Sequence, residues 1–344
     1  QAQDERAVVQ GPAPSATPVP VVATAIPQPT LEAPLPGAVK LEGLRHQWQT
    51  WNNCGPATIT MATSFFGRRE TQVEAARFLK PNDEDKNVSP HELVGYARSV
   101  GLEAQSRVGG DLTRIKQLLA AKVPVIVEVW ISPSPNDWMG HYRLLVGYDD
   151  RAGQFIAYDS VTPPGPNLSQ PYARFDEDWR VFNRTYIPVY TKELAPVVEK
   201  IIGPDLQDGV MYERALAAAQ REVLMTPEDG FAWFNVGSSL SGLGRHAEAA
   251  AAFDKARALR LPWRMLWYQF APFESYLAVG RSEDVLSLTA ANLQRTVDLE
   301  ESHYYRGKAL QLQGKTTEAR TAFQAALRAN NKLSAAQQAL TTLQ

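Results

Sequence analysis

Cys54 is the single cysteine of the chain. A lone cysteine can form no internal disulfide and no thiolate metal cage, so it is either a buried structural thiol or a reactive one. The segment that follows, PATITMATSFF from Pro56 to Phe66, predicts a helix ended by Gly67, which places the thiol at a helix N-terminus. The helix dipole there favours the thiolate, the nucleophilic form of cysteine. Cys54 is therefore a candidate nucleophile for attack on a carbonyl group.

A nucleophilic thiol needs a base, and His141 is the best candidate for that role. It follows a glycine and begins a strand with the apolar sequence LLVGY, which would hold the imidazole in place. The other four histidines are weaker candidates. Three are expected on solvated helices, and the fourth shares a loop with Cys54 and would have to fold back sharply; these are His91, His246, His303 and His46.

The third member of the predicted triad, Asp159, depends on the register of a hairpin. If residues 149–153 form a five-residue loop, Tyr148 pairs with Gln154 and His141 falls opposite Val161. Asp159 then lies diagonal to His141 on the same face and can orient the imidazole. A four-residue loop would place the two side chains on opposite faces, because a slip of one residue turns every side chain over.

Two other aspartates compete with Asp159 for this role. Asp149 and Asp150 also follow the strand of His141, but they occupy a turn, where aspartate is expected for local hydrogen bonding to the backbone. Asp159 remains the predicted orienting carboxylate.

The segments QTWNNCGPATITMATSFFG, GHYRLLVGYDD and FIAYDS resemble the papain-like cysteine peptidases of the bacteriocin-leader-processing family, in their stand-alone, transporter-free form. The resemblance covers about residues 41–195, and its most specific element is CGPA opening a helix after an upstream glutamine. It implies an α+β papain-like peptidase that hydrolyses peptide bonds through a thioester on Cys54, with His141 as base and Asp159 as the orienting group.

The resemblance also implies the donors that stabilise the oxyanion formed when the thiolate attacks. The family uses the backbone N–H of the cysteine and the side-chain amide of a glutamine. By the family's usual spacing this glutamine is Gln49, with Gln47 as the alternative. One departure is Ser160, which follows Asp159 where the family often has proline.

The order of predicted elements agrees with an α+β domain. Helices come first and a sheet follows, and a site can form in the cleft between them. The predicted helices are TQVEAARFLK (71–80), SPHELVGYARSV (89–100) and DLTRIKQLLAAK (111–122), and the strands are VPVIVEVW (123–130), HYRLLVGYD (141–149), QFIAYDS (154–160) and RVFNRTYIPVY (180–190). The aromatic residues Trp48, Trp51, Trp130 and Trp138 are expected either in a substrate groove or in the core.

The C-terminal part repeats itself. Residues Gly237, Ala249, Phe253 and Ala256 recur 70 positions later as Gly307, Ala319, Phe323 and Ala326, and the glycines Gly244, Gly280 and Gly314 are spaced by 36 and 34 residues. This period and the block from residue 229 resemble the tetratricopeptide repeat, which implies an all-α solenoid of about three and a half repeats. The middle copy is degenerate, because Phe273 stands where a small residue belongs.

Composition limits the classes of partner. With 35 Lys plus Arg against 37 Asp plus Glu, the formal charge is -2, which excludes a basic field for nucleic acid. No stretch is long and apolar enough for a transmembrane helix. QGKT at 313–316 lacks the first glycine of a phosphate loop, so no cofactor is expected. The start QAQDER, followed by eight prolines between Pro12 and Pro36, resembles a mature exported protein, so a secreted or envelope-associated bacterial protein is expected.

These observations divide the chain into a Pro-rich tether (1–40), a papain-like cysteine peptidase domain (41–197), a linker (198–208) and tetratricopeptide repeats (209–344). Residues 41–197 are expected to suffice for the chemistry, while the repeats recruit a peptide or protein substrate or a protein partner in their groove. Two alternatives stay open: an acyltransferase or amidase with the same triad, and a binding scaffold in which the peptidase fold is inert.

Overall fold

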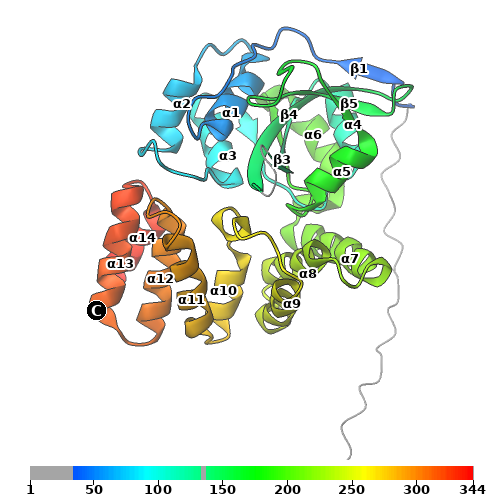
Figure 1. The fold of residues 1–344 in the computed structure, drawn as a ribbon. Coiled ribbons are helices and arrows are strands. Elements are labelled where there is room, and N and C mark those ends of the chain that lie inside the picture. The colour runs from blue at the N-terminus through cyan, green and yellow to red at the C-terminus, as the bar shows by residue number, and fades with distance from the viewer. Residues whose placement is uncertain (1–33, 133–136, 344) are drawn as a thin grey trace, which may run out of the picture. The chain divides into compact units, whose positions relative to one another are not determined.

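An antiparallel sheet organises the N-terminal half of the protein (Figure 1). The computed structural model describes residues 34–132 and 137–343. In this part of the chain the sheet has seven strands in the order β2-β7-β3-β4-β5-β6, and β1 pairs with β4. The strands are β1 (Ala38–Lys40), β2 (Glu103–Ala104), β3 (Val125–Ile131), β4 (Met139–Asp149), β5 (Gln154–Tyr158), β6 (Leu168–Pro171) and β7 (Tyr186–Tyr190).

The helices predicted before the sheet are all present. They are α1 (Cys54–Ser64), α2 (Gln72–Leu79), α3 (Pro90–Ser99) and α4 (Leu112–Ala120), and two further helices follow later, α5 (Tyr172–Arg180) and α6 (Ala195–Ile202). Their starts are capped as the sequence indicates: Ser89 and Glu92 form a capping box, and the Asp111 side chain accepts a hydrogen bond from the backbone of Arg114. The predicted α+β architecture is therefore confirmed for this half.

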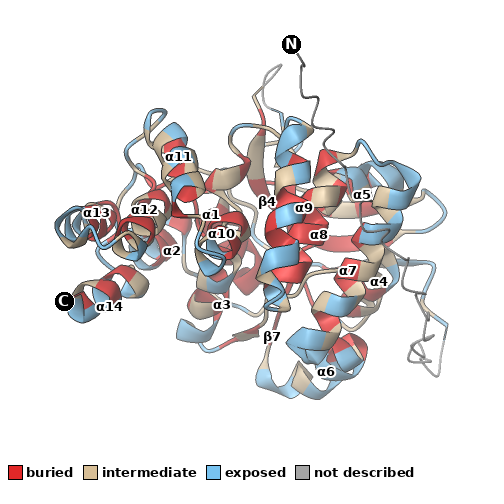
Figure 2. Ribbon diagram, turned by 90° about the horizontal axis from the view of Figure 1, so that it is seen from below, coloured by how far each residue is buried: buried red, intermediate tan, exposed pale blue. Residues whose placement is uncertain are grey.

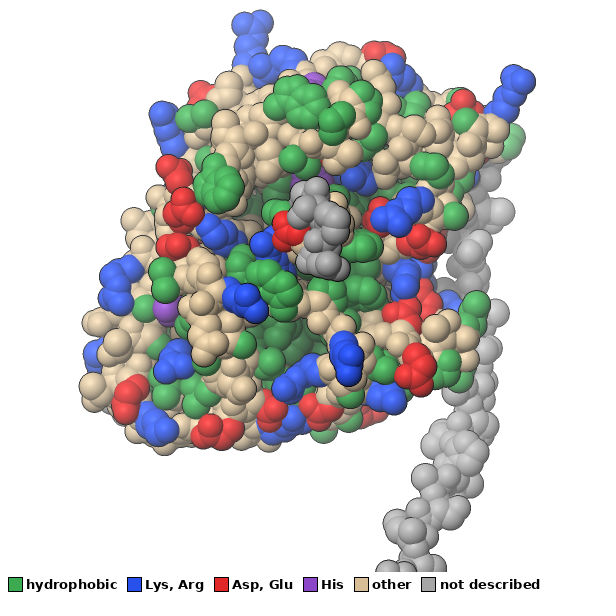
Figure 3. Space-filling view, in the orientation of Figure 1, with side chains coloured by type: hydrophobic (Ala, Val, Ile, Leu, Met, Phe, Trp, Pro, Cys, Tyr) green, Lys and Arg blue, Asp and Glu red, His purple; other side chains and the backbone are tan. Residues whose placement is uncertain are grey.

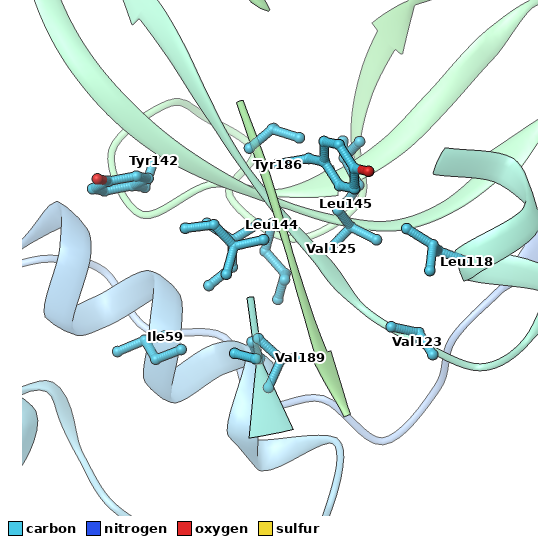
Figure 4. Packing of buried hydrophobic residues seen from close by; sticks show 14 of the residues in the cluster. Ile59, Leu118, Val123, Val125, Tyr142, Leu144, Leu145, Tyr186 and Val189 are labelled. Atoms are coloured by element: carbon cyan, nitrogen blue, oxygen red, sulfur yellow. The ribbon is translucent and has the colours of Figure 1, made fainter. Parts of the chain in front are cut away.

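Helix α1 is the central element of the core. Every residue from Gly55 to Ser64 is buried, and only Cys54 at its first position is partly exposed. Figure 4 shows Ile59 of α1 beside Leu144 of β4 and Val189 of β7. Burying a side chain of this size contributes about 1.5–3 kcal/mol, so packing on all sides fixes the helix against the sheet. The position of the thiol is fixed with it.

The loop of the hairpin between β4 and β5 is one residue shorter than predicted. Asp149 pairs with Gln154, so the loop has four residues and the prediction of five is wrong. A β-bulge between Leu145 and Gly147 then shifts the register by one residue, and Leu144 pairs with Tyr158. The bulge shifts the pairing back by one residue and so compensates for the shorter loop. His141 and Asp159, whose side chains a four-residue loop alone would have placed on opposite faces, therefore share one face.

Other boundaries also differ from the sequence predictions. The strand predicted over residues 180–190 begins only at Tyr186, and the residues before it belong to α5 and a turn. The segment 198–208, predicted as a linker, contains part of α6 and the 3₁₀ helix η2 (Gly203–Leu206), and Val198, Ile201 and Ile202 are buried in the core of the sheet. The end of the predicted tether, residues 38–40, forms β1, whereas residues 1–33 lie outside the described part.

The C-terminal half is helical, as expected. Its helices are α7 (Asp208–Met225), α8 (Gly230–Gly242), α9 (His246–Ala258), α10 (Ala271–Ala278), α11 (Ser282–Leu293), α12 (Glu300–Leu312), α13 (Thr316–Ala329) and α14 (Ser334–Thr342). Figure 2 shows the buried face of α8. A Cβ added at Gly237 would lie 2.6 Å from the ring of Phe253, and one at Gly307 would lie 2.5 Å from the ring of Phe323, so the repeated glycines accept the repeated phenylalanines.

The two halves share side-chain packing. Trp138, Val181 and Phe182, all from the N-terminal half, belong to the hydrophobic cluster of the C-terminal helices. Hydrogen bonds add to this contact, including Arg180 to Asp229 at 2.6 Å and Asn87 to Glu301 at 2.8 Å. The described residues belong to one compact unit. None of the helices within residues 34–132 and 137–343 combines the length and apolar character that a membrane span requires.

Candidate active site

Cys54 begins α1, and the loop before it is held by buried polar side chains. The Lys80 ammonium donates to the backbone oxygen of Asn52 at 3.1 Å. The Asn53 side chain donates to Thr50 at 2.8 Å, and the backbone N–H of Thr50 donates to Gln72 at 2.8 Å. Lys80 and Asn53 are both buried. These hydrogen bonds fix the loop before Cys54 to α2 and to Lys80, the residue that follows α2.

His141 and Asp159 meet as the predicted diagonal pair. The His141 Nε2 atom lies 3.1 Å from the Asp159 Oδ1 atom, and both side chains are buried. The other oxygen of Asp159 accepts a hydrogen bond of 2.8 Å from Nε of Arg143, which is also buried. The backbone N–H groups of Val161 and Thr162 each donate to Oδ1 at 2.8 Å. Because Nε2 faces Asp159, the Nδ1 atom of His141 is the nitrogen left for the thiol.

The charges of this group are mutually stabilised. Burial opposes the charged imidazolium, but the Asp159 carboxylate and Cys54 raise the pKa of His141 to about 9. Burial likewise opposes the thiolate, yet hydrogen bonding to His141, the imidazolium charge and the backbone N–H groups of Tyr142 and Gly55 lower the pKa of Cys54. Burial also opposes the Asp159 carboxylate, but His141 and Arg143 hold its pKa well below its usual range. Each group therefore favours the charged form of its neighbour: His141 favours the thiolate, and Cys54 and Asp159 favour the imidazolium.

The two candidate oxyanion donors have different surroundings. The amide of Gln47 is engaged at both ends: its Nε2 donates to Thr60 at 3.0 Å, and its Oε1 accepts from the backbone of Gln72 at 3.0 Å. The Gln49 Oε1 atom accepts a 2.8 Å hydrogen bond from the Ser160 hydroxyl, and its Nε2 has no partner among the described residues. The side-chain N–H groups of Gln49 are therefore without a partner in the described part of the protein, whereas both ends of the Gln47 amide are engaged.

Ser160, the departure from the resembled family, thus has a role in this chain. Its hydroxyl bonds the Gln49 side chain, and its backbone oxygen accepts from the Gln49 N–H at 2.9 Å. The loop of the orienting carboxylate and the loop of the oxyanion donor are joined directly. A proline at this position would lack the hydroxyl.

Two residues near the triad were not predicted from the sequence. Arg143 stands two positions after His141 on the same strand, and a charged residue inside the apolar run HYRLLVGY was the available signal. His46 does fold back, contrary to the sequence argument: its Nε2 lies 2.7 Å from the backbone oxygen of Asp159, and its ring packs on Trp48. The aspartate of the turn, Asp149, caps its own loop by accepting from the backbone of Arg151 at 2.9 Å.

This arrangement of thiolate, imidazolium and carboxylate at a helix N-terminus can be compared with known families. Residues 41–187 match the family described as Peptidase_C39 like family. The match includes Cys54, His141, Asp159 and Gln49, and it gives the N-terminal half the fold of a C39-like cysteine peptidase. No curated protein matches the chain.

Solved structures resemble the C39-like domain at low identity. The peptidase domain of Streptococcus ComA, a bi-functional ABC transporter involved in a quorum sensing pathway, is 19% identical, with 44% of this chain and 100% of that chain covered and a TM-score of 0.35. A double glycine motif protease from an AMS/PCAT transporter, in complex with its leader peptide, is 16% identical, with 45% and 95% covered and a TM-score of 0.32.

The pKa shifts predict a bell-shaped pH profile for reaction at Cys54. Since the pKa of Cys54 is lowered, the thiolate forms at a lower pH than in a free thiol. The kcat/KM for a peptide should rise on the acid side as Cys54 ionises and fall near pH 9, where His141 loses the proton that it gives to the leaving group. Stopped-time assays from pH 4 to pH 10 measure both limbs, and a profile that still rises between pH 9 and pH 10 would exclude the ion pair.

Asp159→Asn should move the alkaline limb of this profile to lower pH, because the carboxylate that raises the pKa of His141 is lost. The variant should keep measurable activity, since the amide oxygen can still accept a hydrogen bond. It should also melt earlier, because it leaves the buried Arg143 without its counter-charge, a change that costs about 3–5 kcal/mol in comparable buried pairs.

The matched control for this variant is Asp149→Asn. Asp149 is the half-buried last residue of the same strand, and an asparagine oxygen can accept the same backbone hydrogen bonds. Its pH profile and Tm should equal those of the parent. A larger loss of activity at Asp149 than at Asp159 would reverse the assignment.

Proposed function

We propose that the protein is a cysteine peptidase that hydrolyses peptide bonds through a thioester on Cys54. The observation that supports the proposal most strongly is the buried pair of His141 and Asp159, with His141 Nε2 3.1 Å from Asp159 Oδ1, together with the thiol of Cys54 at the N-terminus of α1, whose pKa is lowered by His141. The match of residues 41–187 to the Peptidase_C39 like family supports the same reaction class. In this proposal His141 is the acid and base, Asp159 orients it, and Gln49 is the side-chain oxyanion donor.

The proposed reaction has two half-reactions. The Cys54 thiolate adds to the carbonyl carbon of the scissile bond, and the carbonyl oxygen takes the negative charge near the Gln49 amide and the backbone N–H of Cys54. The His141 imidazolium gives its proton to the leaving nitrogen as the C–N bond breaks, which releases the amine. Water then loses a proton to His141 and attacks the thioester, and the C–S bond breaks to give the acid and the free thiolate.

We further propose that the C-terminal helices are tetratricopeptide-type repeats that hold part of the substrate outside the catalytic cleft. Two observations support this: the paired packing of Gly237 on Phe253 and of Gly307 on Phe323, and an apolar cavity in the same helices. The cavity has a volume of about 270 Å³, and its lining includes Phe234, Phe253, Leu261, Trp263 and Leu288. A cavity of this size can receive one large apolar side chain of an extended peptide.

Removal of the nucleophile tests the reaction directly. Cys54→Ala should reduce hydrolysis of a diverse peptide library by more than about a thousandfold, and His141→Ala should act on the same step, so the double variant should be hardly worse than either single variant. Mass spectrometry of the products would show free carboxylates, which distinguishes hydrolysis from transfer to another acceptor. Additive losses, or cleavage by Cys54→Ala at a rate near that of the parent, would contradict the proposal.

Substitution at the mouth of the cavity tests the role of the repeats. Ala291 is exposed on α11 and lines the cavity, so Ala291→Arg should obstruct it without disturbing the fold. For an unfolded protein such as β-casein we expect kcat/KM to fall about five- to tenfold, which corresponds to the loss of one apolar contact. For a short peptide with the same cleaved bond, kcat/KM should be unchanged.

The control for this experiment is Ala247→Arg, at an exposed alanine of α9 that does not line the cavity. It adds the same charge to the same half of the protein. Equal kinetics for the two variants on β-casein, or an equal loss on β-casein and on the short peptide, would show that the cavity does not hold the substrate.

A further inference from the structure

The C-terminal helices depart from their repeat pattern at one place, residues 265–270. Helix α8 begins at Gly230 and α12 at Glu300, which are 70 residues apart, so the helix between them is expected to begin near residue 265. Instead α10 begins at Ala271, and residues 265–267 form the short 3₁₀ helix η3. The cause is Pro272, whose ring would clash with the carbonyl of residue 268 if the helix continued toward the N-terminus.

This irregular segment brings Tyr268 to the strand of the catalytic histidine. A Cβ added at Gly140, the residue before His141, would lie 2.9 Å from Cγ of Tyr268 and 3.1 Å from the ring of Phe182. The Tyr268 ring also packs on Trp138, with 5.9 Å between ring centroids. Glycine at position 140 is therefore required for the ring to approach the backbone beside the active site.

The segment is anchored on both sides of Tyr268. The Gln269 side chain donates to the backbone oxygen of Val181 at 3.1 Å. Arg264 forms an ion pair of 2.8 Å with Asp137, just before the strand of His141, and its guanidinium lies 5.4 Å from the ring centroid of Trp267. Tyr268 is thus held in place by contacts with the C39-like domain.

The Tyr268 ring lies against Gly140, the residue before His141, and its hydroxyl is a hydrogen-bond donor. Burial and the negative charge of Cys54 raise the pKa of Tyr268 well above its usual value, although a hydrogen bond from the Gly140 backbone opposes the shift, so the phenol keeps its proton at neutral pH. No side-chain hydrogen bond occupies this hydroxyl among the residues that the structure describes.

Buried donors without acceptors gather around the same segment. The indole N–H groups of Trp138 and Trp267 and the Nε of Arg264 have no partner in the described part of the protein. An unpaired buried donor costs about 1–3 kcal/mol, a cost that an acceptor on a bound molecule would remove. Peptide main chains carry such acceptors at every residue. Figure 3 shows hydrophobic side chains in a hollow on one face of the molecule, with charged side chains of both signs around it.

We propose that Tyr268 of the C-terminal half is a substrate-binding residue of the catalytic cleft, where its hydroxyl donates a hydrogen bond to a main-chain carbonyl of the peptide bound at Cys54. The inference rests on the proposed peptidase function and adds to it that the helical half completes the cleft in the same chain. Trp138 and Phe182 support the Tyr268 ring, and Gly140 gives it room.

The test compares two thiol reagents on the full chain, one with a peptide backbone and one without. Acetyl-Ala-Ala-Ala vinyl sulfone carries main-chain carbonyls, whereas iodoacetamide reports only on the reactivity of Cys54. Tyr268→Phe removes the hydroxyl and keeps the ring. Its alkylation by the vinyl sulfone should be about five- to tenfold slower than that of the parent, the size of one neutral hydrogen bond, while alkylation by iodoacetamide and the Tm should be unchanged.

The matched control is Tyr304→Phe, at a half-buried tyrosine of α12 that packs on Phe323. It should match the parent with both reagents. The proposal is overturned if Tyr268→Phe also matches the parent with both reagents. It is equally overturned if the substitution slows alkylation by both reagents by the same factor. The same holds if the peptide backbone of the vinyl sulfone gives the parent no increase in the rate of alkylation.

Failure of the proposed function gives a different result. A Cys54 that is unreactive toward iodoacetamide, or a selective vinyl sulfone reaction without hydrolysis of any peptide, would count against the peptidase. An unreactive Cys54 overturns both proposals, because no alkylation ratio then exists. A selective vinyl sulfone reaction without hydrolysis overturns only the peptidase, since the ratio of Tyr268→Phe to parent still measures peptide recognition by Tyr268.

Discussion

The buried carboxylate of Asp159 is the interaction on which the site depends. Transfer of an ionised carboxylate from water into a protein interior costs several kcal/mol, and only a nearly complete set of donors offsets that cost. Here the donors come from His141, Arg143 and the backbone of Val161 and Thr162. One anion therefore fixes the end of β5, the middle of β4 and the loop that follows. It also sets which nitrogen of His141 faces the thiol.

The rest of the site is built outward from this carboxylate. The next residue, Ser160, holds Gln49, and Gln49 lies in the loop that leads to Cys54. The helix of Cys54 is fixed independently by burial on every side. Cys54, His141 and Gln49, the proposed nucleophile, base and oxyanion donor, thus occupy three segments of the chain whose relative positions are set by one ion cluster and one apolar core. The same arrangement raises the pKa of His141 and lowers the pKa of Cys54 although burial opposes the charged form of each group.

Much of this could be predicted from the sequence, and the failures have physical reasons. The elements that carry Cys54, His141 and Asp159 follow from local signals such as Pro56 and the apolar strand LLVGY. The hairpin register does not, because the four-residue loop and the bulge at Val146 each shift it by one residue and only their sum reproduces the predicted pairing. The choice between the two glutamines depends on contacts of Gln47 with Thr60 and Gln72, which periodicity cannot show.

The contact of Gly140 with Tyr268 bears on how such proteins can change during evolution. Repeat arrays and catalytic domains are often exchanged as independent modules, but here the two halves share a hydrophobic cluster. Trp138, Val181 and Phe182 are buried under the C-terminal helices, and a new partner domain without a matching turn would leave these side chains open to water. Side chains at positions 140 and 268 must therefore change together. Recombination at this junction is constrained by the same close packing that brings Tyr268 to the strand of His141.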